Sequence, residues 1–369
     1  MPTAYLELNL PKSYSDVYYS LAHPTDWEDV FLCERYLGTY YLHLYMIPAT
    51  VIEVFRLLGF NTLLALFAAR ICSGMVFVAA GCLFLHLMPY GKTWFLVFLL
   101  NPMLIQQEAS CSADSVANVV AIGYFVAVLV IYSEKIYTRK SAAAMICFSV
   151  LLVLSKAMFA PLVLLNLVYL GDIFKSGKLF KAYLLVLATC LLLVAIVTTF
   201  YSGSFMRDSF ELMKDPLHCL MVLLRSIWEV GPFWFESYAG SSLGALSIST
   251  WSPALIFYFM IQAVVLFYND EAVDVDLNMV QKALFSIVSL VNFFLIIISM
   301  REWTLSVDHR EDIIMGVQGR YLIPLVSPIL LCILRSHPGV SSGKVMSTVC
   351  GLLIGILALD IYTVMASFV

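Results

Sequence analysis

The chain has 369 residues, of which 62% are hydrophobic and 12% are charged, and its formal net charge is -4. A soluble globular domain carries roughly 45–50% apolar and about 25% charged residues, so a water-soluble fold is excluded for much of this chain. The small negative charge and the lack of a basic run argue against a nucleic-acid partner.

The N-terminal stretch Met1–Gly38 is polar and acidic and carries the pair Glu28-Asp29. It contains no apolar h-region, so it is not a signal peptide, and it begins as a loop would. Residues 1–61 are predicted to form an extracytoplasmic loop, reached without a first membrane span. Within that loop, Tyr40–Leu58 mixes aromatic, charged and apolar residues. This mixture predicts a helix lying at the membrane interface, with a plain transmembrane helix as the competing interpretation.

Residues 62–369 are predicted to form a polytopic transmembrane domain. A membrane helix needs about 20 mostly apolar residues, and the whole pattern predicts an all-α protein with about ten membrane helices. The clear candidate spans are Thr62–Met88, Ser115–Ser133, Ala182–Tyr201, Trp251–Tyr268, Lys282–Ser299, Tyr321–Leu334 and Val345–Phe368.

Two further apolar segments contain breaks. Thr93–Gln106 is short and contains Pro102, which predicts a kinked or tilted span. Ala142–Leu170 is too long for one helix and is interrupted at Ser155-Lys156, which predicts two short helices with the lysine near the tip.

Basic residues in short loops set the orientation of the bundle. Lys135, Arg139 and Lys140 lie in one loop, and Pro89–Lys92, Asp172–Lys181 and Arg335–Lys344 supply the other basic positions. Alternation of the spans places all four on the cytoplasmic side. The acidic stretch Asn269–Asn278 also falls inside, although acids contribute little to orientation. The long external connections are then Met1–Asn61, Gln106–Asp114, Ser202–Thr250 and Met300–Gly319.

Three polar groups border the external ends of spans. Gln106–Asp114 ends in a carboxylate that could act as a general base or hold a divalent cation, although Ser112 or Asp114 could simply cap the next helix. Lys156, within an apolar hairpin, could bind phosphate or pair with Asp114, or snorkel to the interface. Arg320 offers a planar fork suited to phosphate or carboxylate, or serves to anchor its span.

Two weaker features complete the pattern. Arg70 lies inside an apolar span and needs a partner or water. The external connection Ser202–Thr250 contains a short amphipathic run, Leu217–Val230, and an aromatic stretch from Trp228 to Tyr238. Such a stretch could line a groove for a lipid tail or a sugar, although aromatic belts at the membrane interface are commoner.

The order of motifs resembles a known family. A span with Ala68-Ala69-Arg70 is followed by N-P-x-x-x-Q-x-x-S-x-S-x-D from Asn101 to Asp114, a lysine-bearing hairpin, and Q-G-R-Y-x-x-P from Gln318 to Pro324. From about Tyr40 onward, the chain resembles a bacterial predicted-membrane-protein family of unknown function that is related to the GT-C glycosyltransferases.

The resemblance implies a GT-C-like helical bundle with an interfacial helix in its first external loop. Enzymes of that class move a sugar from a polyprenyl-phosphate carrier to an acceptor on the extracytoplasmic side. The resemblance makes Asp114 the acidic residue, with Glu28 and Asp29 as the nearest acids in the first external loop. It assigns the carrier phosphate to Lys156 and Arg320, and substrate contacts are expected from Gln107, Ser112, Gln318 and Tyr321.

The first span and its acidic motif are not visible in this sequence, which predicts either an N-terminally incomplete or an inactive member. Three functions therefore stay open. The first is a lipid-linked sugar transferase of the bacterial cytoplasmic membrane, with membrane lipids and envelope-biosynthesis proteins as partners. The second is a non-catalytic component of polysaccharide or glycolipid assembly or export. The third is a small-molecule transporter, which the lack of detectable internal repeats argues against.

Overall fold

The computed structural model describes residues 14–23, 27, 42–169, 207–243, 248–267, 277–334 and 342–366, with a few isolated positions between 181 and 192. These residues are almost entirely helical, as the sequence predicts. A two-stranded antiparallel ribbon pairs Ser242 with Ser249 and Leu243 with Ile248. The elements are α1 (Tyr14–Ala22), the 3-10 helix η3 (Leu42–Tyr45), α2 (Met46–Leu57), α3 (Thr62–Leu87), α4 (Lys92–Leu99), α5 (Pro102–Glu108), α6 (Ala113–Ser133), α7 (Arg139–Ser155), the 3-10 helix η4 (Ala157–Tyr169), α10 (Arg207–Lys214), α11 (Pro216–Tyr238), β1 (Ser242–Leu243), β2 (Ile248–Ser249), α12 (Ser252–Phe267), α13 (Met279–Ser299), α14 (Arg301–Val307), the 3-10 helix η5 (Gly319–Leu322), α15 (Ile323–Ile333) and α16 (Ser342–Ala366).

Polar residues in the sequence set where several of these helices begin. Asn61 caps α3, where its Oδ1 atom accepts a hydrogen bond of 2.8 Å from the backbone N–H of Leu63. Capping boxes begin α7 at Thr138 and α13 at Asn278, each with a polar side chain three residues later that returns the hydrogen bond. These caps satisfy backbone N–H groups that have no partner inside the helix.

Both predicted helix breaks are confirmed. α4 ends before Asn101, which caps α5, and Pro102 takes the first helical position of α5, where its missing N–H costs nothing. α7 ends at Ser155, and the residue that follows, Lys156, has an extended backbone, with φ -150° and ψ 118°. The 3-10 helix η4 then returns from the lysine, so the long apolar segment is two helices, as predicted.

Four helices in the described part of the chain are long and apolar enough to cross a membrane. They are Thr62–Leu87, Ala113–Ser133, Met279–Val307 and Val345–Ala366. Shorter apolar helices cover Ala157–Tyr169, Ser252–Phe267 and Gly319–Ile333. These apolar helices indicate a protein that crosses the membrane several times. The predicted span Ala182–Tyr201 lies almost wholly outside the described residues.

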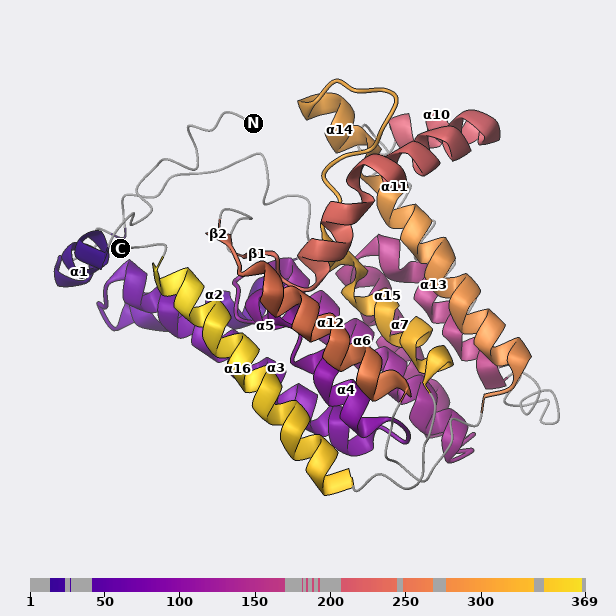
Figure 1. Cartoon of the computed structure of the whole chain (residues 1–369), viewed down its shortest axis with the longest axis horizontal. Helices are drawn as coiled ribbons and strands as arrows, with labels where there is room; N and C mark the ends of the chain where they lie inside the picture. Colours follow the sequence, from indigo (N-terminus) through magenta and orange to yellow (C-terminus); the bar gives the residue numbers. More distant parts are fainter. Residues whose placement is uncertain are drawn as a thin grey trace.

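The helices differ in how much of their surface the protein itself covers. In the most apolar 18-residue stretch of α6, 67% is buried inside the molecule. The corresponding share is 22% in both α3 and α16. α6 therefore lies at the centre, where the Tyr124 hydroxyl donates a 2.9 Å hydrogen bond to the carbonyl of Val163 in η4. α16 and α13 lie on opposite sides of the bundle (Figure 1). Their exposed apolar faces suit lipid as the surrounding medium.

Some segments expected to be loops are helical. The segment 202–250, predicted as an external loop with a short amphipathic run, contains α10 and the long helix α11. α11 begins at Pro216, because the side chain of Asp215 accepts hydrogen bonds from two backbone N–H groups and proline is favoured at the first helical position. α14 lies in the next predicted loop, and α1 in the N-terminal one.

The predicted interfacial segment Tyr40–Leu58 is helical where the structure describes it, as η3 and α2. α2 packs along α3 and has 12 residues. A helix of that length spans about 18 Å, well short of a hydrocarbon core of about 30 Å. Its charged residues pair with each other, with Arg56 Nη2 at 2.6 Å from Glu53 Oε1. The length therefore disfavours the plain transmembrane interpretation.

Candidate functional site

The candidate site begins at the turn between α5 and α6. Ser112 takes the N-cap position of α6, but its side chain makes no capping hydrogen bond. Its hydroxyl instead lies 2.7 Å from the hydroxyl of Ser110. Asp114, in the first turn of α6, uses its carboxylate in ion pairs. Ser112 therefore takes the predicted cap position without capping the helix through its side chain, and the Asp114 carboxylate has partners outside the helix.

Three predicted residues from distant parts of the chain meet here. Lys156, at the tip of the α7–η4 hairpin, forms an ion pair with Oδ1 of Asp114. Arg320, in η5, places its Nε atom 3.2 Å from Oδ2 of the same carboxylate. We call Asp114, Lys156 and Arg320 the ion-pair cluster. The side chains of Lys156 and Asp114 are only 3% and 11% exposed, whereas that of Arg320 is 25% exposed. The cluster is thus buried on the lysine side and open on the arginine side.

Burial explains why these charges occur together. A charged side chain transferred alone into an apolar interior loses its hydration, so buried charges are paired. In the two ion pairs of this cluster, one carboxylate faces two cations. An anion reaching Arg320 would meet this cation in a medium that screens charge weakly.

Tyr321 lies against both cations of the cluster. Lys156 Nζ is 4.7 Å from the centre of its ring, and the guanidinium carbon of Arg320 is 5.2 Å away. Arg320 Nη2 also donates a 3.3 Å hydrogen bond to the Tyr321 hydroxyl. Phe159 adds a second ring, 5.7 Å from Lys156 Nζ. These aromatic faces stabilise the cations without neutralising them.

A close backbone contact fixes the position of Arg320. A Cβ atom at Gly319 would collide with the backbone of Trp234 and Tyr238 in α11, so only glycine fits there. The N–H of Gly319 donates a 2.9 Å hydrogen bond to the hydroxyl of Ser237. η5 therefore sits directly on the last turns of α11.

The other predicted site residues have different surroundings. Gln107 is buried, and its amide nitrogen contacts Met103 Sδ at 3.7 Å and Gln106 Oε1 at 3.3 Å. Gln318 takes the N-cap position of η5, with its amide oxygen buried and without a hydrogen-bond partner. Glu28 and Asp29 lie outside the described residues.

Arg70 finds a partner at this turn. Its Nε atom donates a 2.9 Å hydrogen bond to the carbonyl of Ala109, between α5 and α6. The intramembrane arginine noted in the sequence thus ties α3 to the segment that presents Asp114. Within the described ranges, no group of three or more His, Cys, Asp or Glu side chains could hold a metal ion.

Two residues near the cluster were not predicted. Glu108, the last residue of α5, is fully buried, and its Oε2 atom accepts a 3.2 Å hydrogen bond from Ser115. Burial raises the pKa of Glu108 well above its ordinary value, and the charge of Asp114 adds to this effect. Tyr45 in η3 is half-buried, and burial together with the Asp114 carboxylate raises the pKa of its hydroxyl, while Lys156 acts in the opposite direction.

The signals for these two residues were partial. Glu108 is an acid within the polar stretch Gln106–Asp114, and this could have drawn attention to it. Tyr45 reaches the cluster only because η3 packs against α6, a contact that no local pattern reveals.

Comparison with known proteins gives one match. A family model described as predicted membrane protein (DUF2142) matches residues 6–329. No curated protein and no solved structure matches the chain. The family match agrees with the resemblance to a predicted-membrane-protein family, and the relationship to GT-C glycosyltransferases stays a prediction.

Proposed function

This chain belongs to the predicted membrane protein family DUF2142, and we propose that it transfers a sugar from a polyprenyl-phosphate carrier to a cell-envelope acceptor, with a GT-C-like bundle. The observation that carries the proposal is the ion-pair cluster. Lys156 and Arg320 meet at one buried carboxylate beside apolar membrane helices. Ionisable groups at membrane depth are costly and mark functional sites, and paired cations suit a phosphate group.

The cluster can exchange partners when a phosphate arrives. Without ligand, both cations are shared by Asp114. The phosphate of a lipid carrier would offer its own oxygens to Lys156 Nζ and to the guanidinium of Arg320, which would release the carboxylate. Because the phosphate gains negative charge as its bond to the sugar breaks, cations fixed in a weakly screening site lower the barrier.

The bond changes then follow. The oxygen of the acceptor hydroxyl attacks the anomeric carbon of the sugar. The bond from that carbon to the phosphate oxygen breaks, and its electron pair leaves with the phosphate. The hydroxyl proton passes to the carboxylate of Asp114, which acts as general base.

Other predicted residues have supporting roles. Sugar contacts are assigned to Ser112 and Tyr321, and the position of Ser112 two residues before Asp114 and of Tyr321 beside both cations supports this assignment. Gln107 and Gln318 are assigned further substrate contacts. Glu28 and Asp29 are a second source of an acidic group, either as a base or as ligands of a divalent cation.

We assign the protein to the bacterial cytoplasmic membrane, with the site facing outward and about ten membrane helices in all. Asp114 lies in the first turn of α6, and Lys135 follows the other end of this 21-residue helix. Such a helix is about 32 Å long, so the basic α6–α7 connection and the site lie on opposite sides of a bilayer. Basic loops stay in the cytoplasm, which leaves the site outside.

A second function has an observation in its favour. Asp114 is already engaged by two cations, an arrangement that would also suit a purely structural ion-pair network. The alternative is a non-catalytic component of polysaccharide or glycolipid assembly or export, which binds the lipid phosphate without transfer.

A transfer assay distinguishes these functions. The full chain in proteoliposomes is given a radiolabelled polyprenyl-phosphate sugar and a cell-envelope acceptor fraction. The Asp114→Asn variant is compared with wild type, and Asp308→Asn, an exposed acid after α14, serves as the matched control. Removal of a general base predicts a loss of about a hundredfold or more in Asp114→Asn. Unchanged transfer in that variant, or no transfer by wild type that still binds the lipid, would contradict catalysis by this cluster.

A further inference from the structure

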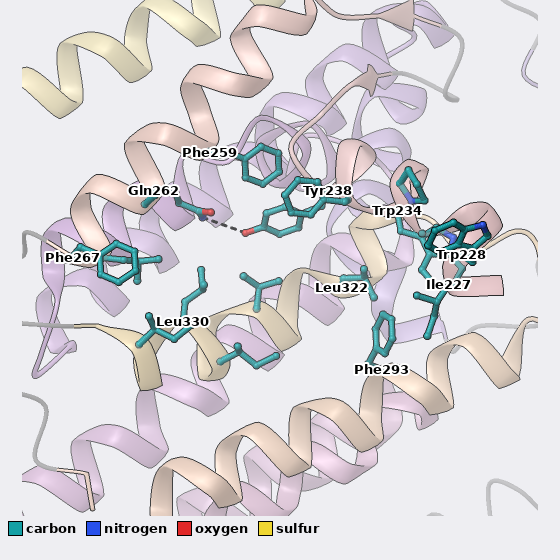
Figure 2. A pocket seen from close by; sticks show the side chains of 18 of the residues that line it. Ile227, Trp228, Trp234, Tyr238, Phe259, Gln262, Phe267, Phe293, Leu322 and Leu330 are labelled. Carbon is teal, nitrogen blue, oxygen red and sulfur yellow. Dashed lines mark hydrogen bonds between the residues drawn. The ribbon is translucent and has the colours of Figure 1, made fainter. Parts of the chain in front are cut away.

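An apolar groove runs between α11, α12, α13 and α15. Its volume is about 970 Å³, and its walls are aromatic and aliphatic, with Trp234, Phe259, Phe267, Phe293 and Leu330 among them. Figure 2 shows side chains from these helices facing a common space. A volume near 1,000 Å³ lies at the upper end for small-molecule sites, so the groove can hold a large apolar group.

The amide of Gln262 and the hydroxyl of Tyr238, which both line this groove, are already engaged with each other. Gln262 Nε2 donates hydrogen bonds to the hydroxyls of Tyr238, at 3.3 Å, and Tyr258, at 3.1 Å (Figure 2 draws the first). A sugar buried here would need partners for many hydroxyls, and each unmet partner is costly. A hydrocarbon chain needs none, so the lining favours a chain over a sugar.

The groove and the ion-pair cluster are joined by one short segment. In η5, Arg320 belongs to the cluster and Tyr321 lies against it, and the next residue, Leu322, lines the groove. α15 continues the wall as far as Ile333. At 1.5 Å per residue, the stretch from Leu322 to Ile333 is about 16 Å long, so the groove leads away from the cations along a helix.

The groove is also accessible from the side of the molecule. Trp228 on α11 is 83% exposed, and Phe235 and Phe267 are exposed as well. Exposed apolar side chains suit contact with lipid tails, and a lipid that entered the groove from the bilayer would not have to cross water. The two cations of the cluster and the apolar character of the groove together match a lipid with one anionic end.

We propose that this groove binds the hydrocarbon chain of the same lipid whose phosphate is held by Lys156 and Arg320. The inference rests on the proposed function for the identity of the headgroup. It adds a second binding determinant on α11 and α12, which sets a preference for long-chain carriers. The contact of Gly319 with α11 links this chain site to the position of Arg320.

A glycine in the groove wall allows a direct test. Gly231 lines the groove, and a Cβ added there meets nothing nearer than Ile227 Cγ2 at 3.7 Å. Gly231→Leu therefore adds a side chain to the groove while favouring the helix. The matched control is Gly355→Leu on α16, where a Cβ has nothing within 4 Å. Ala263→Leu fills the same groove from α12 and serves as a second variant.

Binding is measured with the full chain in nanodiscs, using three probes: a long-chain polyprenyl phosphate, the matching polyprenol, and geranyl phosphate. Loss of two buried methylene contacts corresponds to about a tenfold fall in affinity. Gly231→Leu and Ala263→Leu are expected to lower affinity for both long-chain probes by at least that factor, with geranyl phosphate unchanged. Gly355→Leu is expected to bind all three as wild type does.

Each other outcome has a defined meaning. Unchanged long-chain affinity in both groove variants, or an equal loss in Gly355→Leu, overturns the proposal. Lys156→Gln separates it from the proposed function, since loss of the cation should weaken both phosphates and spare polyprenol. If Lys156→Gln has no effect while the groove variants weaken polyprenol binding, the groove is a chain site and the phosphate assignment is wrong.

Discussion

Lys156 and Asp114 form an ion pair whose side chains are 3% and 11% exposed, which makes it the most buried pair among the ion pairs of the described residues. Arg320 approaches the same carboxylate from another element. Removal of one partner of such a pair leaves a buried charge without compensation, which costs more than the pair itself contributes.

The first prediction concerns the coupling between these two residues. Asp114→Asn leaves two cations without their carboxylate, whereas Lys156→Met leaves Asp114 still paired with Arg320. We expect Asp114→Asn to cost about 3 kcal/mol of unfolding free energy and Lys156→Met to cost less. In the double variant, the loss of unfolding free energy should be smaller than the sum of the two single losses by about 1 kcal/mol or more. Unfolding in mixed detergent measures all three variants, and strictly additive losses would contradict a direct pair.

The second prediction concerns the shape of the Arg320 side chain. Its planar guanidinium contacts both the Asp114 carboxylate and the Tyr321 hydroxyl. Lysine presents one compact charge and cannot make both contacts, so Arg320→Lys should weaken binding of polyprenyl phosphate by about tenfold. The control Arg310→Lys alters an exposed arginine paired with Asp312 and should bind as wild type does. Equal affinities in the two variants would show that charge alone suffices at Arg320.

The third prediction tests the backbone contact at Gly319. Gly319→Ala forces η5 away from α11, because the new methyl group would meet the backbone of Tyr238. Overpacking of this kind costs roughly 1–3 kcal/mol, and here it also displaces Arg320. We expect a lower unfolding temperature together with weaker phosphate binding. Gly351→Ala on α16, where a Cβ has open space, should be neutral or slightly stabilising. Wild-type behaviour of Gly319→Ala would mean that η5 is not held against α11.

The fourth prediction follows from the buried carboxyl of Glu108. Burial raises its pKa well above the ordinary value in the folded protein, so the folded state holds a proton that the unfolded chain releases at lower pH. The contribution of this group is therefore full below the unfolded pKa and is lost as pH rises toward the folded pKa.

Glu108→Gln keeps the shape and the neutral form, so it should remove this part of the pH dependence. Between pH 5 and pH 8, the unfolding temperature should fall more steeply for wild type than for Glu108→Gln. Glu302→Gln, in α14, changes a less buried acid and serves as the comparison. Identical pH profiles for wild type and Glu108→Gln would show that Glu108 carries no proton in the fold.

Local chemistry made much of the helical pattern predictable. Pro102 marked the break between α4 and α5, and Lys156 marked the break between α7 and η4, because each disfavours continuation of an apolar helix. The run Leu217–Val230 was recognised as amphipathic, but its extension to Tyr238 was not, since Gly231 and Pro232 read locally as a helix end.

The candidate site was predictable only as a set of separate residues. Asp114, Lys156 and Arg320 each stand out as a charge next to an apolar run, and a pairing of Lys156 with Asp114 was one option. That Arg320 joins them depends on the packing of η5 against α11, where Gly319 admits a backbone contact. The groove was equally hidden, because its walls come from four helices and no single helix shows it.

The central claim is that Lys156 and Arg320 hold the phosphate of a lipid, and one ratio tests it most directly. Affinities for a long-chain polyprenyl phosphate and for the matching polyprenol are measured on the full chain in nanodiscs, for wild type, Lys156→Gln and Arg320→Gln. Wild type should bind the phosphate about a hundredfold more tightly than the alcohol. In each variant this ratio should fall by about tenfold, with the affinity for polyprenol unchanged. Equal affinity of wild type for the phosphate and the alcohol, or an undiminished preference in both variants, would contradict the claim.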